Sequence, residues 1–246
     1  MSLREEFEKS GNWLFQGRSY FPLLVGILFL IALRHFTYPY HNHVLDEIWG
    51  FFCLGISFLG LGIRALTIGF TPKGTSGRTT QKPAATTLNT SGMYSIVRHP
   101  LYLGNFFIWV GILLSTRFWW FTLVAVLLFW LYYERIMFAE EEFLRKKFGE
   151  VYLEWAAKTP AFLPRLKNWQ RPRLPFSFKT VLRKEYSGFF GVIALFTVLE
   201  LIEDWIVEKK LVWDPIWTVL FILGFVVFVV LRTLKKKTRL LNVEGR

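Results

Sequence analysis

Apolar residues in this chain gather in blocks that are long enough to form membrane helices, with charged and polar stretches between them. Six blocks can be recognised, at residues 20–33, 48–70, 101–114, 118–133, 188–202 and 216–231. Several are shorter than the roughly 20 residues that cross a bilayer, but Trp, Tyr, Arg and Lys side chains at their ends can reach the interface. The pattern predicts an all-α, polytopic integral membrane protein with about six transmembrane helices.

The composition of the chain agrees with this class. With 53% apolar and 19% aromatic residues, the chain is too apolar for an ordinary soluble domain. The single cysteine, Cys53, lies inside an apolar block, which excludes an intramolecular disulfide and disfavours a thiolate metal site. We therefore expect Cys53 to be a buried packing residue, and we expect no metal site.

Positive charges are distributed unevenly around the predicted spans. If the N-terminus is cytoplasmic, 25 of the 30 Lys and Arg residues fall in cytoplasmic segments, whereas Arg34, Arg117, Lys209 and Lys210 fall outside. This bias predicts six spans with both termini in the cytoplasm. The formal charge of +12 then faces anionic lipid headgroups, and no nucleic-acid-binding motif accompanies it. We expect membrane lipids and no nucleic acid as partners, and the sequence leaves the oligomeric state open.

The polar stretches divide the chain into two parts. Residues 1–165 are predicted to form a membrane core, and residues 166–246 a cytoplasmic linker followed by two further membrane helices. Within the core, residues 71–92 are rich in Gly, Ser, Thr and Pro and predict a cytoplasmic loop between the second and third spans. This loop either covers a site as a lid or is a solvated linker, and the sequence leaves both readings open.

Candidate functional residues are densest between residues 92 and 164. The segment GMYSIVRHPLYLG places Arg98, His99 and Pro100 directly before the third span. Pro100 suits the first position of a helix, because its missing N–H would have no partner there. His99 is therefore expected at the start of that helix, at a membrane face.

The fourth apolar block continues without Gly or Pro through Glu140, Glu141 and Glu142 as far as Gly149, a plausible helix end. A helix of about 30 residues is about 45 Å long, which exceeds a hydrocarbon core of about 30 Å. The carboxylates are therefore expected at the water boundary, beside Arg98 and His99. Arg145, four residues after Glu141, is expected to pair with it.

The second span holds a charge and several small residues. Arg64 is costly inside an apolar span unless it faces a polar cavity or a carboxylate, although it could also extend to the interface. Gly55, Gly60, Gly62 and Gly69 indicate that another helix approaches closely. We therefore treat Arg64 as a candidate site residue.

These residues resemble a known family. GMYSIVRHPLYLG, a hairpin of spans, EE..L...FG..Y and TPAFLP are similar to the isoprenylcysteine carboxyl methyltransferases and the related phospholipid methyltransferases, over about residues 48–165. The resemblance implies S-adenosylmethionine-dependent methyl transfer within the membrane, without a Rossmann domain. It also implies a cofactor pocket at the cytoplasmic face, lined by His99, Pro100, Leu101, Tyr102, Leu103, Gly104, Glu140 and Glu141.

The methyl acceptor is left open. Arg98 and His99 are the candidate catalytic residues, and Arg64, Arg98 and Arg165 are the candidate acceptor-binding residues. The nearby cations favour an anionic lipid or lipidated acceptor, such as a lipid A phosphate or a prenylcysteine carboxylate. An amino headgroup is the alternative, and it would require a carboxylate or His99 to act as base. A non-catalytic transport or structural protein of the same fold is a further alternative.

Overall fold

The computed structural model describes residues 2–17, 26, 36–38, 42–75, 85–211 and 213–246. Within these residues all regular structure is helical, as predicted. The elements are α1 (Leu3–Gln16), α3 (His43–Phe70), α4 (Met93–Ile96), α5 (Pro100–Ser115), α6 (Trp119–Phe148), α7 (Glu150–Lys158), the 3-10 helix η2 (Leu166–Asn168), α8 (Phe178–Glu208) and α9 (Pro215–Lys237). The first predicted span, residues 20–33, lies almost entirely outside the described residues.

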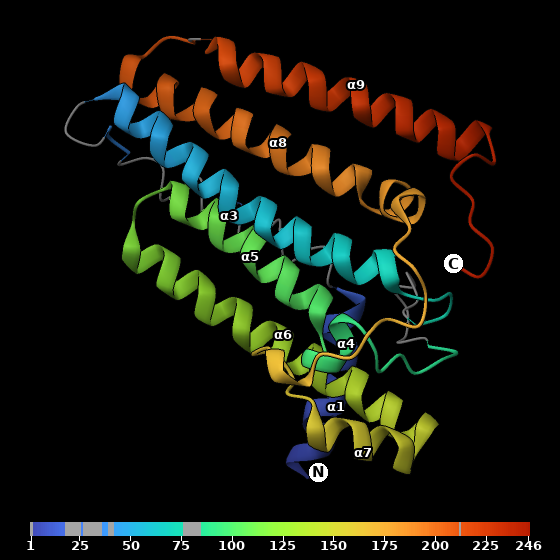
Figure 1. The fold of residues 1–246 in the computed structure, drawn as a ribbon. Coiled ribbons are helices and arrows are strands. Elements are labelled where there is room, and N and C mark those ends of the chain that lie inside the picture. The colour runs from blue at the N-terminus through green and yellow to red at the C-terminus, as the bar shows by residue number, and fades with distance from the viewer. Residues whose placement is uncertain (1, 18–25, 27–35, 39–41, 76–84, 212) are drawn as a thin grey trace.

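Five long helices lie side by side in the order α9, α8, α3, α5 and α6 (Figure 1). Neighbouring helices run in opposite directions. The connections between them therefore lie alternately at the two ends of the bundle. One end, here called the turn end, carries the start of α3, the end of α8 and the connection from α5 to α6. The other, here called the motif end, carries α4, α7 and the chain around His99. The predicted site therefore lies at the motif end.

Helices α3 and α5 pack closely through small residues. A Cβ atom at Gly60 would overlap the carbonyl oxygen of Gly104 and would lie 2.7 Å from the Ile108 nitrogen. Ser57 Oγ, one turn away, donates to the Ile108 carbonyl at 2.9 Å. The predicted close approach is therefore confirmed at Gly60. It is wrong for Gly55 and Gly62, where an added Cβ would meet nothing within 4 Å.

Two predicted helix boundaries and one packing residue are confirmed. Pro100 begins α5, and Gly149 ends the 30-residue helix α6 with a φ of +55°. This left-handed conformation suits glycine, because it has no Cβ to clash with the backbone. Cys53 is fully buried in the apolar core formed by α3, α5, α6, α8 and α9.

Three of the described helices are long and apolar enough to cross a membrane, namely α3, α6 and α9. Helix α5 is apolar but has only 16 residues. Helix α8 contains the predicted block at residues 188–202, and it also buries Glu200, Glu203 and Asp204 near its end. The described residues thus form a helical protein with three candidate membrane spans.

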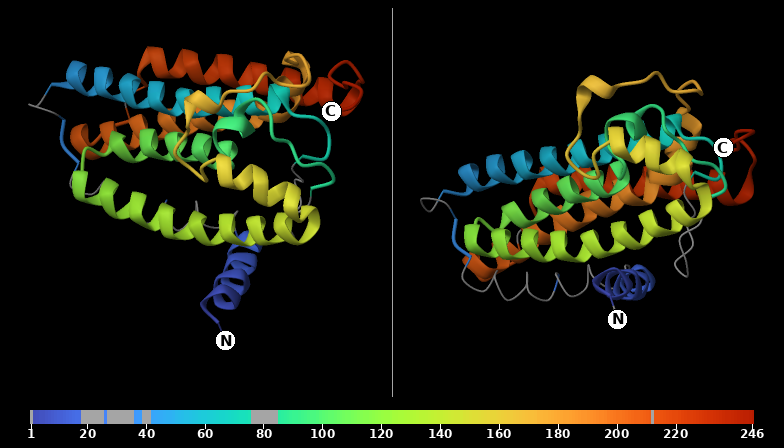
Figure 2. Two further views of the ribbon diagram at one scale, coloured as in Figure 1. Left: turned by 60° about the horizontal axis from the view of Figure 1, so that its bottom comes forward. Right: turned by 90° about the horizontal axis from the view of Figure 1, so that it is seen from below.

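Helix α1 crosses α6 at the motif end and projects from the bundle (Figure 2). Its first turn is closed by a capping box between Ser2 and Glu5. A Cβ at Gly11 would overlap the Arg135 carbonyl oxygen, so the two helices touch there. Arg4 Nη2 also lies 2.6 Å from Glu142 Oε2. Glu142 therefore anchors α1.

Candidate functional site

Two segments that are about 60 residues apart in the chain meet beside His99. The backbone nitrogens of Arg98 and His99 donate to the carbonyls of Pro160 and Ala161, at 2.9 and 3.2 Å. The Arg165 nitrogen donates to the Ile96 carbonyl at 2.9 Å. The motif around His99 is therefore held by the TPAFLP segment that follows α7.

His99 precedes α5 and turns its ring toward α6. It occupies the N-cap position, but its side chain makes no capping hydrogen bond. Instead, Nε2 lies 3.0 Å from Glu141 Oε1, and Nδ1 lies 3.6 Å from Glu140 Oε2. Tyr102, one turn into α5, donates its hydroxyl to Glu140 Oε1 at 2.7 Å. The imidazole and two carboxylates thus form one network across the α5–α6 hairpin.

The two carboxylates change the protonation of His99. Burial lowers the pKa of its imidazole, but contacts with Glu140 and Glu141 raise it by more. The net pKa therefore lies above the ordinary value, since nearby negative charge favours the imidazolium. The protonated ring can donate to both carboxylates at once.

Arg98 is held by contacts with two helices, α6 and α7. Its Nε lies 2.9 Å from Glu141 Oε1, and its Nη1 donates to the Ala156 carbonyl at 2.9 Å. Glu141 therefore faces both Arg98 and His99. The predicted pairing of Glu141 with Arg145 is wrong, because Arg145 lies nearest Glu142, at 3.7 Å.

Arg64 makes a second polar cluster with residues from two other helices. Its Nε and Nη2 donate to the two carboxylate oxygens of Glu185, each at 2.8 Å. Its Nη1 donates to Asn105 Oδ1 at 2.7 Å. This bidentate ion pair joins α3 to α8, so Arg64 has a carboxylate partner inside the protein.

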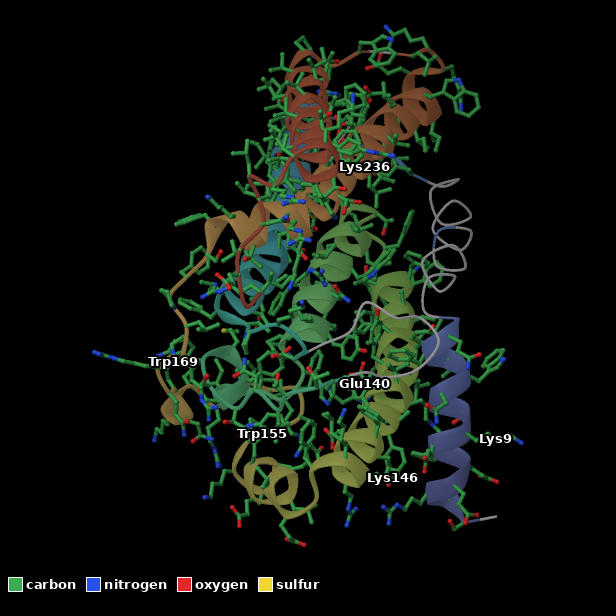
Figure 3. All side chains as sticks on the ribbon, turned by 90° about the vertical axis from the view of Figure 1, so that its right-hand side faces the viewer. Lys9, Glu140, Lys146, Trp155, Trp169 and Lys236 are labelled. Carbon is green, nitrogen blue, oxygen red and sulfur yellow. The ribbon has the colours of Figure 1, made fainter. Side chains whose placement is uncertain are left out.

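A cavity of about 470 Å³ lies between these clusters. Arg64, Glu185 and Asn105 form one part of its wall, and Arg98, His99 and Glu140 another. The remaining wall is largely aromatic and apolar, with Phe15, Tyr94, Tyr102, Tyr133, Phe143, Ile68 and Leu144. Glu140 lies on the inner side of α6, whereas Lys9 points outward from α1 (Figure 3). The cavity volume of about 470 Å³ falls in the range of small-molecule and cofactor sites.

The structure places the predicted site residues in four groups. The cavity is lined by His99, Pro100, Leu101, Tyr102, Glu140, Arg64 and Arg98. Glu141 is not part of the wall, but it contacts Arg98 and His99 from behind. Leu103 packs into an apolar core cluster, and Gly104 faces α3, where its missing side chain makes room for Arg64.

Arg165, the remaining predicted residue, lies outside this cavity. It lines a second hollow of about 440 Å³, together with Lys158, Thr159 and Arg98. Arg98 lines both spaces.

Several lining residues were missed by the sequence analysis. Asn105 and Glu185 complete the Arg64 cluster, and Phe15 comes from α1. The available signal was weak: Asn105 is an isolated amide in an apolar block, and Glu185 stands just before another block. Residues 76–84 of the loop proposed as a lid lie outside the described residues, while Thr75 and Ala85 on either side line the cavity.

Comparison with known proteins finds a family resemblance in the region that supplies most of the cavity wall. A sequence model of the phospholipid methyltransferase family matches residues 49–151. This stretch, called the family region below, is therefore similar to the phospholipid methyltransferase family. The family region spans most of α3, all of α4, α5 and α6, and the start of α7. It therefore supplies His99, Glu140 and Arg64, whereas Glu185 comes from α8, outside the family region.

Three relatives are similar to part of the chain. The cobalt-zinc-cadmium resistance protein CzcN of Cupriavidus metallidurans is 42% identical over 84 residues, which cover 34% of this chain and 38% of that protein. The nickel-cobalt-cadmium resistance protein NccN of Alcaligenes xylosoxydans xylosoxydans is 39% identical over 82 residues, 33% of this chain and 38% of that protein. The protein-S-isoprenylcysteine O-methyltransferase of Schizosaccharomyces pombe is 37% identical over 81 residues, 31% of this chain and 33% of that protein.

The chain thus spans less than two-fifths of the length of each of these relatives. No solved structure matched the chain. Its likeness to the phospholipid methyltransferase family is concentrated in the helices that surround the cavity.

Proposed function

We propose that the chain is an S-adenosylmethionine-dependent methyltransferase that acts on the polar head of a lipid or lipidated molecule, and that the cavity at the motif end holds the cofactor. The observation that carries this proposal is the joining of His99, Glu140 and Tyr102 in one cavity built from the family region. A phospholipid methyltransferase family member is expected to keep its cofactor site among these helices.

The residues of the cavity suit such a cofactor. Glu140 offers carboxylate oxygens that accept hydrogen bonds from ribose hydroxyls or an amino group. Tyr102 and Tyr133, whose ring centres are 4.9 Å apart, present aromatic faces that attract a cation. S-Adenosylmethionine, when bound, supplies a methyl group carried on a positively charged sulfur.

The chain's own contribution is positioning. Glu141 and the Ala156 carbonyl fix Arg98, and Glu185 and Asn105 fix Arg64, so both guanidinium groups have restricted orientations. Holding two reacting groups in line supplies up to about 7–11 kcal/mol of a barrier. An anionic acceptor needs no proton removed before methylation, so positioning alone serves it.

We place the head of the acceptor near Arg98. This arginine lines the cofactor cavity and also the second hollow, where Arg165 and Lys158 add two further cations. An anionic head in the second hollow would lie beside the cofactor cavity and contact Arg98 from its other side. The positive lining supports a carboxylate or phosphate acceptor over an amine.

The proposal includes a membrane arrangement. We place both termini, the loop at residues 71–92 and the motif end of the bundle in the cytoplasm, with about six spans in the whole chain. The distribution of Lys and Arg along the sequence supports this orientation. The cofactor cavity then opens where a water-soluble cofactor and a lipid head can meet.

Methyl transfer to total lipid extract tests the proposal. Purified chain in detergent is incubated with methyl-labelled cofactor and lipids, and the lipid fraction is counted before and after mild base. Label that is lost in mild base indicates a carboxylate ester. Base-stable label indicates either an N-methyl group or a methyl phosphate ester, and mass spectrometry distinguishes these two. The Glu140→Gln variant should lose label, whereas Glu134→Gln, an exposed change on the same helix, should not.

A role in metal resistance is the second candidate function. It is favoured by the similarity to two proteins named for resistance to cobalt, cadmium and zinc or nickel. Growth of a deletion strain on these metals, complemented with wild type or with Glu140→Gln, separates the candidates. Rescue by wild type alone would link resistance to methyl transfer, and rescue by both would indicate a non-catalytic role.

A further inference from the structure

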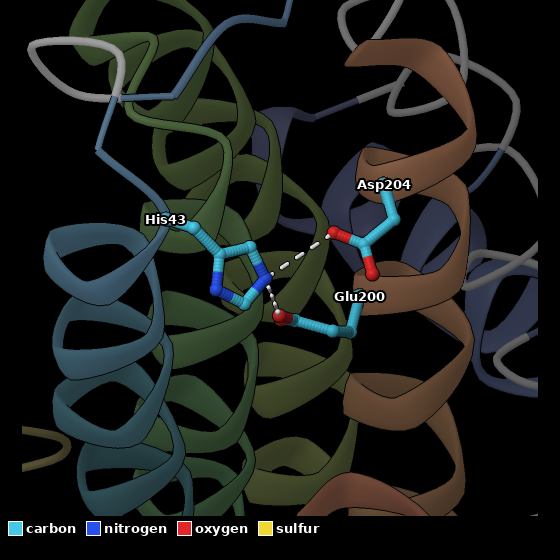
Figure 4. A group of neighbouring side chains, drawn as sticks. All are labelled: His43, Glu200 and Asp204. Carbon is cyan, nitrogen blue, oxygen red and sulfur yellow. Dashed lines mark ion pairs between the residues drawn. The ribbon is translucent and has the colours of Figure 1, made fainter. Parts of the chain in front are cut away.

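A second polar cluster lies at the turn end, remote from the cavity. His43 and Asp46 come from the first turn of α3, and Glu200, Glu203 and Asp204 from the last part of α8. His43, Glu200 and Asp204 point toward one another from the two helices (Figure 4). All five residues lie outside the family region, which begins at residue 49.

The four carboxylates of this cluster are buried. The exposed fractions are 3% for Asp46, 5% for Glu200, 4% for Glu203 and 1% for Asp204. Each has one oxygen that is buried and accepts no hydrogen bond, namely Asp46 Oδ2, Glu200 Oε1, Glu203 Oε1 and Asp204 Oδ2. Buried polar atoms normally have partners, and unpaired buried carboxylates are costly.

The neighbouring residues satisfy only part of this charge. Arg117 pairs with Asp46 Oδ1, and Tyr38 donates its hydroxyl to Asp204 Oδ1 at 2.6 Å. Among the described residues, Arg117 and His43 are the only cationic or potentially cationic side chains paired with the cluster. Four converging carboxylates thus exceed the positive charge that the described residues provide.

The spacing of the donor atoms fits a shared ion. His43 Nε2 lies 3.5 Å from Asp204 Oδ1 and 3.8 Å from Glu200 Oε1, beyond ordinary hydrogen-bond length. The three donor atoms all lie within 4.8 Å of one another. Two donors that bind one Zn²⁺ at about 2.0–2.2 Å with tetrahedral angles are about 3.3–3.6 Å apart. Small side-chain movements would therefore bring these three atoms around one ion.

We propose that His43, Glu200 and Asp204 bind a divalent transition-metal ion at the turn end. One imidazole with two carboxylates is a donor set suited to Zn²⁺ and its first-row neighbours. The Tyr38 hydroxyl orients Asp204, as hydrogen-bonded groups commonly orient metal ligands. Asp46 and Glu203, which share Glu200 in a second group of converging carboxylates, add negative charge next to the ion.

A bound ion would link α3 to α8, and it could reach the site from solvent. His43 is about one-third exposed, with a side-chain exposed fraction of 34%, so its ring borders solvent while the carboxylates are enclosed. The sequence predicted no metal site, because its single cysteine disfavours a thiolate site. No cysteine contributes to the site proposed here. The inference does not depend on the proposed methyl transfer, because the cluster lies at the opposite end of the bundle.

Zn²⁺ binding to the full chain tests the site. Protein purified in detergent is treated with a chelator, which is then removed. Binding of added Zn²⁺ is measured by calorimetry, and the Zn²⁺ retained after gel filtration is measured by elemental analysis. We expect one tightly held Zn²⁺ per chain and a rise in the thermal unfolding midpoint on its addition. Because ligands are removed, His43→Ala and Glu200→Gln should weaken binding by at least about tenfold and abolish the rise in midpoint.

The matched control is Glu208→Gln, which changes an exposed carboxylate one turn beyond Asp204 on the same helix. It should bind Zn²⁺ like the wild type. His43 is partly exposed, so His43→Ala is expected to fold even if a buried substitution does not. Absence of stoichiometric Zn²⁺ on the wild type, or equal affinity of wild type, His43→Ala and Glu200→Gln, would overturn the assignment.

Discussion

His99 has one carboxylate near each of its ring nitrogens, and this position governs how it titrates. Its pKa is raised because Glu140 and Glu141 together outweigh the effect of burial. A histidine with a raised folded-state pKa adds stability that is fully present below its unfolded pKa of about 6.5. That contribution is lost as the pH rises through the higher folded value.

Glu141→Gln should therefore lower the pKa of His99 and flatten the pH dependence of stability above about pH 6.5. The amide keeps the shape of the carboxylate but removes its charge. Histidine NMR titration of the labelled protein, with thermal unfolding from pH 6 to 9, measures both effects. If the His99 titration does not move, Glu141 is not what raises its pKa.

Arg98→Lys addresses the acceptor. Lysine has a single ammonium group and cannot keep contacts with Glu141 and Ala156 while also presenting a planar fork to an anion. Loss of a charge-assisted contact of about 1.5–3 kcal/mol should reduce turnover by about 10- to 150-fold, with a smaller change in cofactor affinity. Unchanged turnover at saturating cofactor would contradict the anionic-acceptor assignment and favour an amine.

The sequence indicated part of this site. The RHP segment and the Glu pair could be expected to meet, because each stands at the end of a predicted span on the same membrane face. The partners within the site could not be foreseen. Sequence spacing predicted Arg145 as the ion-pair partner of Glu141. In the structure its partners are Arg98 and His99, which contact it across the α5–α6 hairpin. Glu185 lies 121 residues from Arg64, and only the packing of α8 on α3 brings them together.

Among the helices, the α3–α5 contact depends on one glycine more than on the others. Gly60→Ala should lower the thermal midpoint, because its Cβ would overlap the Gly104 carbonyl and push the helices apart. Gly62→Ala, two residues further along α3, meets nothing within 4 Å and should be neutral or stabilising by up to about 1 kcal/mol. Thermal unfolding of the two variants compares them, and equal destabilisation would contradict the packing described for α3 and α5.

Helix ends were better predicted than helix contacts. Proline at the start of α5 and glycine after α6 act through their own backbone geometry, so they can be read locally. The glycines of α3 show the limit of such reasoning. Five glycines lie on α3. Whether each one faces a neighbouring helix depends on the rotation and crossing of α3 against α5, which cannot be read from the local sequence pattern.

At the scale of the whole molecule, the two ends of the bundle should lie on opposite sides of the membrane. Cys53 is buried, so exposed single-cysteine substitutions can be labelled with little background. Lys167→Cys, at the motif end, should be protected from an impermeant maleimide in intact cells, whereas Lys210→Cys, beyond the end of α8, should react. Labelling of Lys167→Cys from outside would contradict the cytoplasmic placement of the motif end.

The predicted division at residue 165 follows a change in the sequence pattern. Residues on both sides of it, however, contribute to the cavity. Helix α8 follows that boundary, but its Lys184 and Glu185 line the cavity and Glu185 holds Arg64. The C-terminal part is therefore part of the cavity wall. This could not be inferred from the resemblance, which covered only the residues before it.

Calorimetric titration of the full chain with S-adenosylmethionine tests the central assignment most directly, because it needs no knowledge of the acceptor. The wild type should bind one equivalent, and Glu140→Gln should bind about 10- to 150-fold more weakly, since a charge-assisted contact is lost. Glu134→Gln, exposed on the same helix, should match the wild type. Absence of binding to the wild type, or equal affinity for the wild type and Glu140→Gln, would contradict the assignment of this cavity to the cofactor.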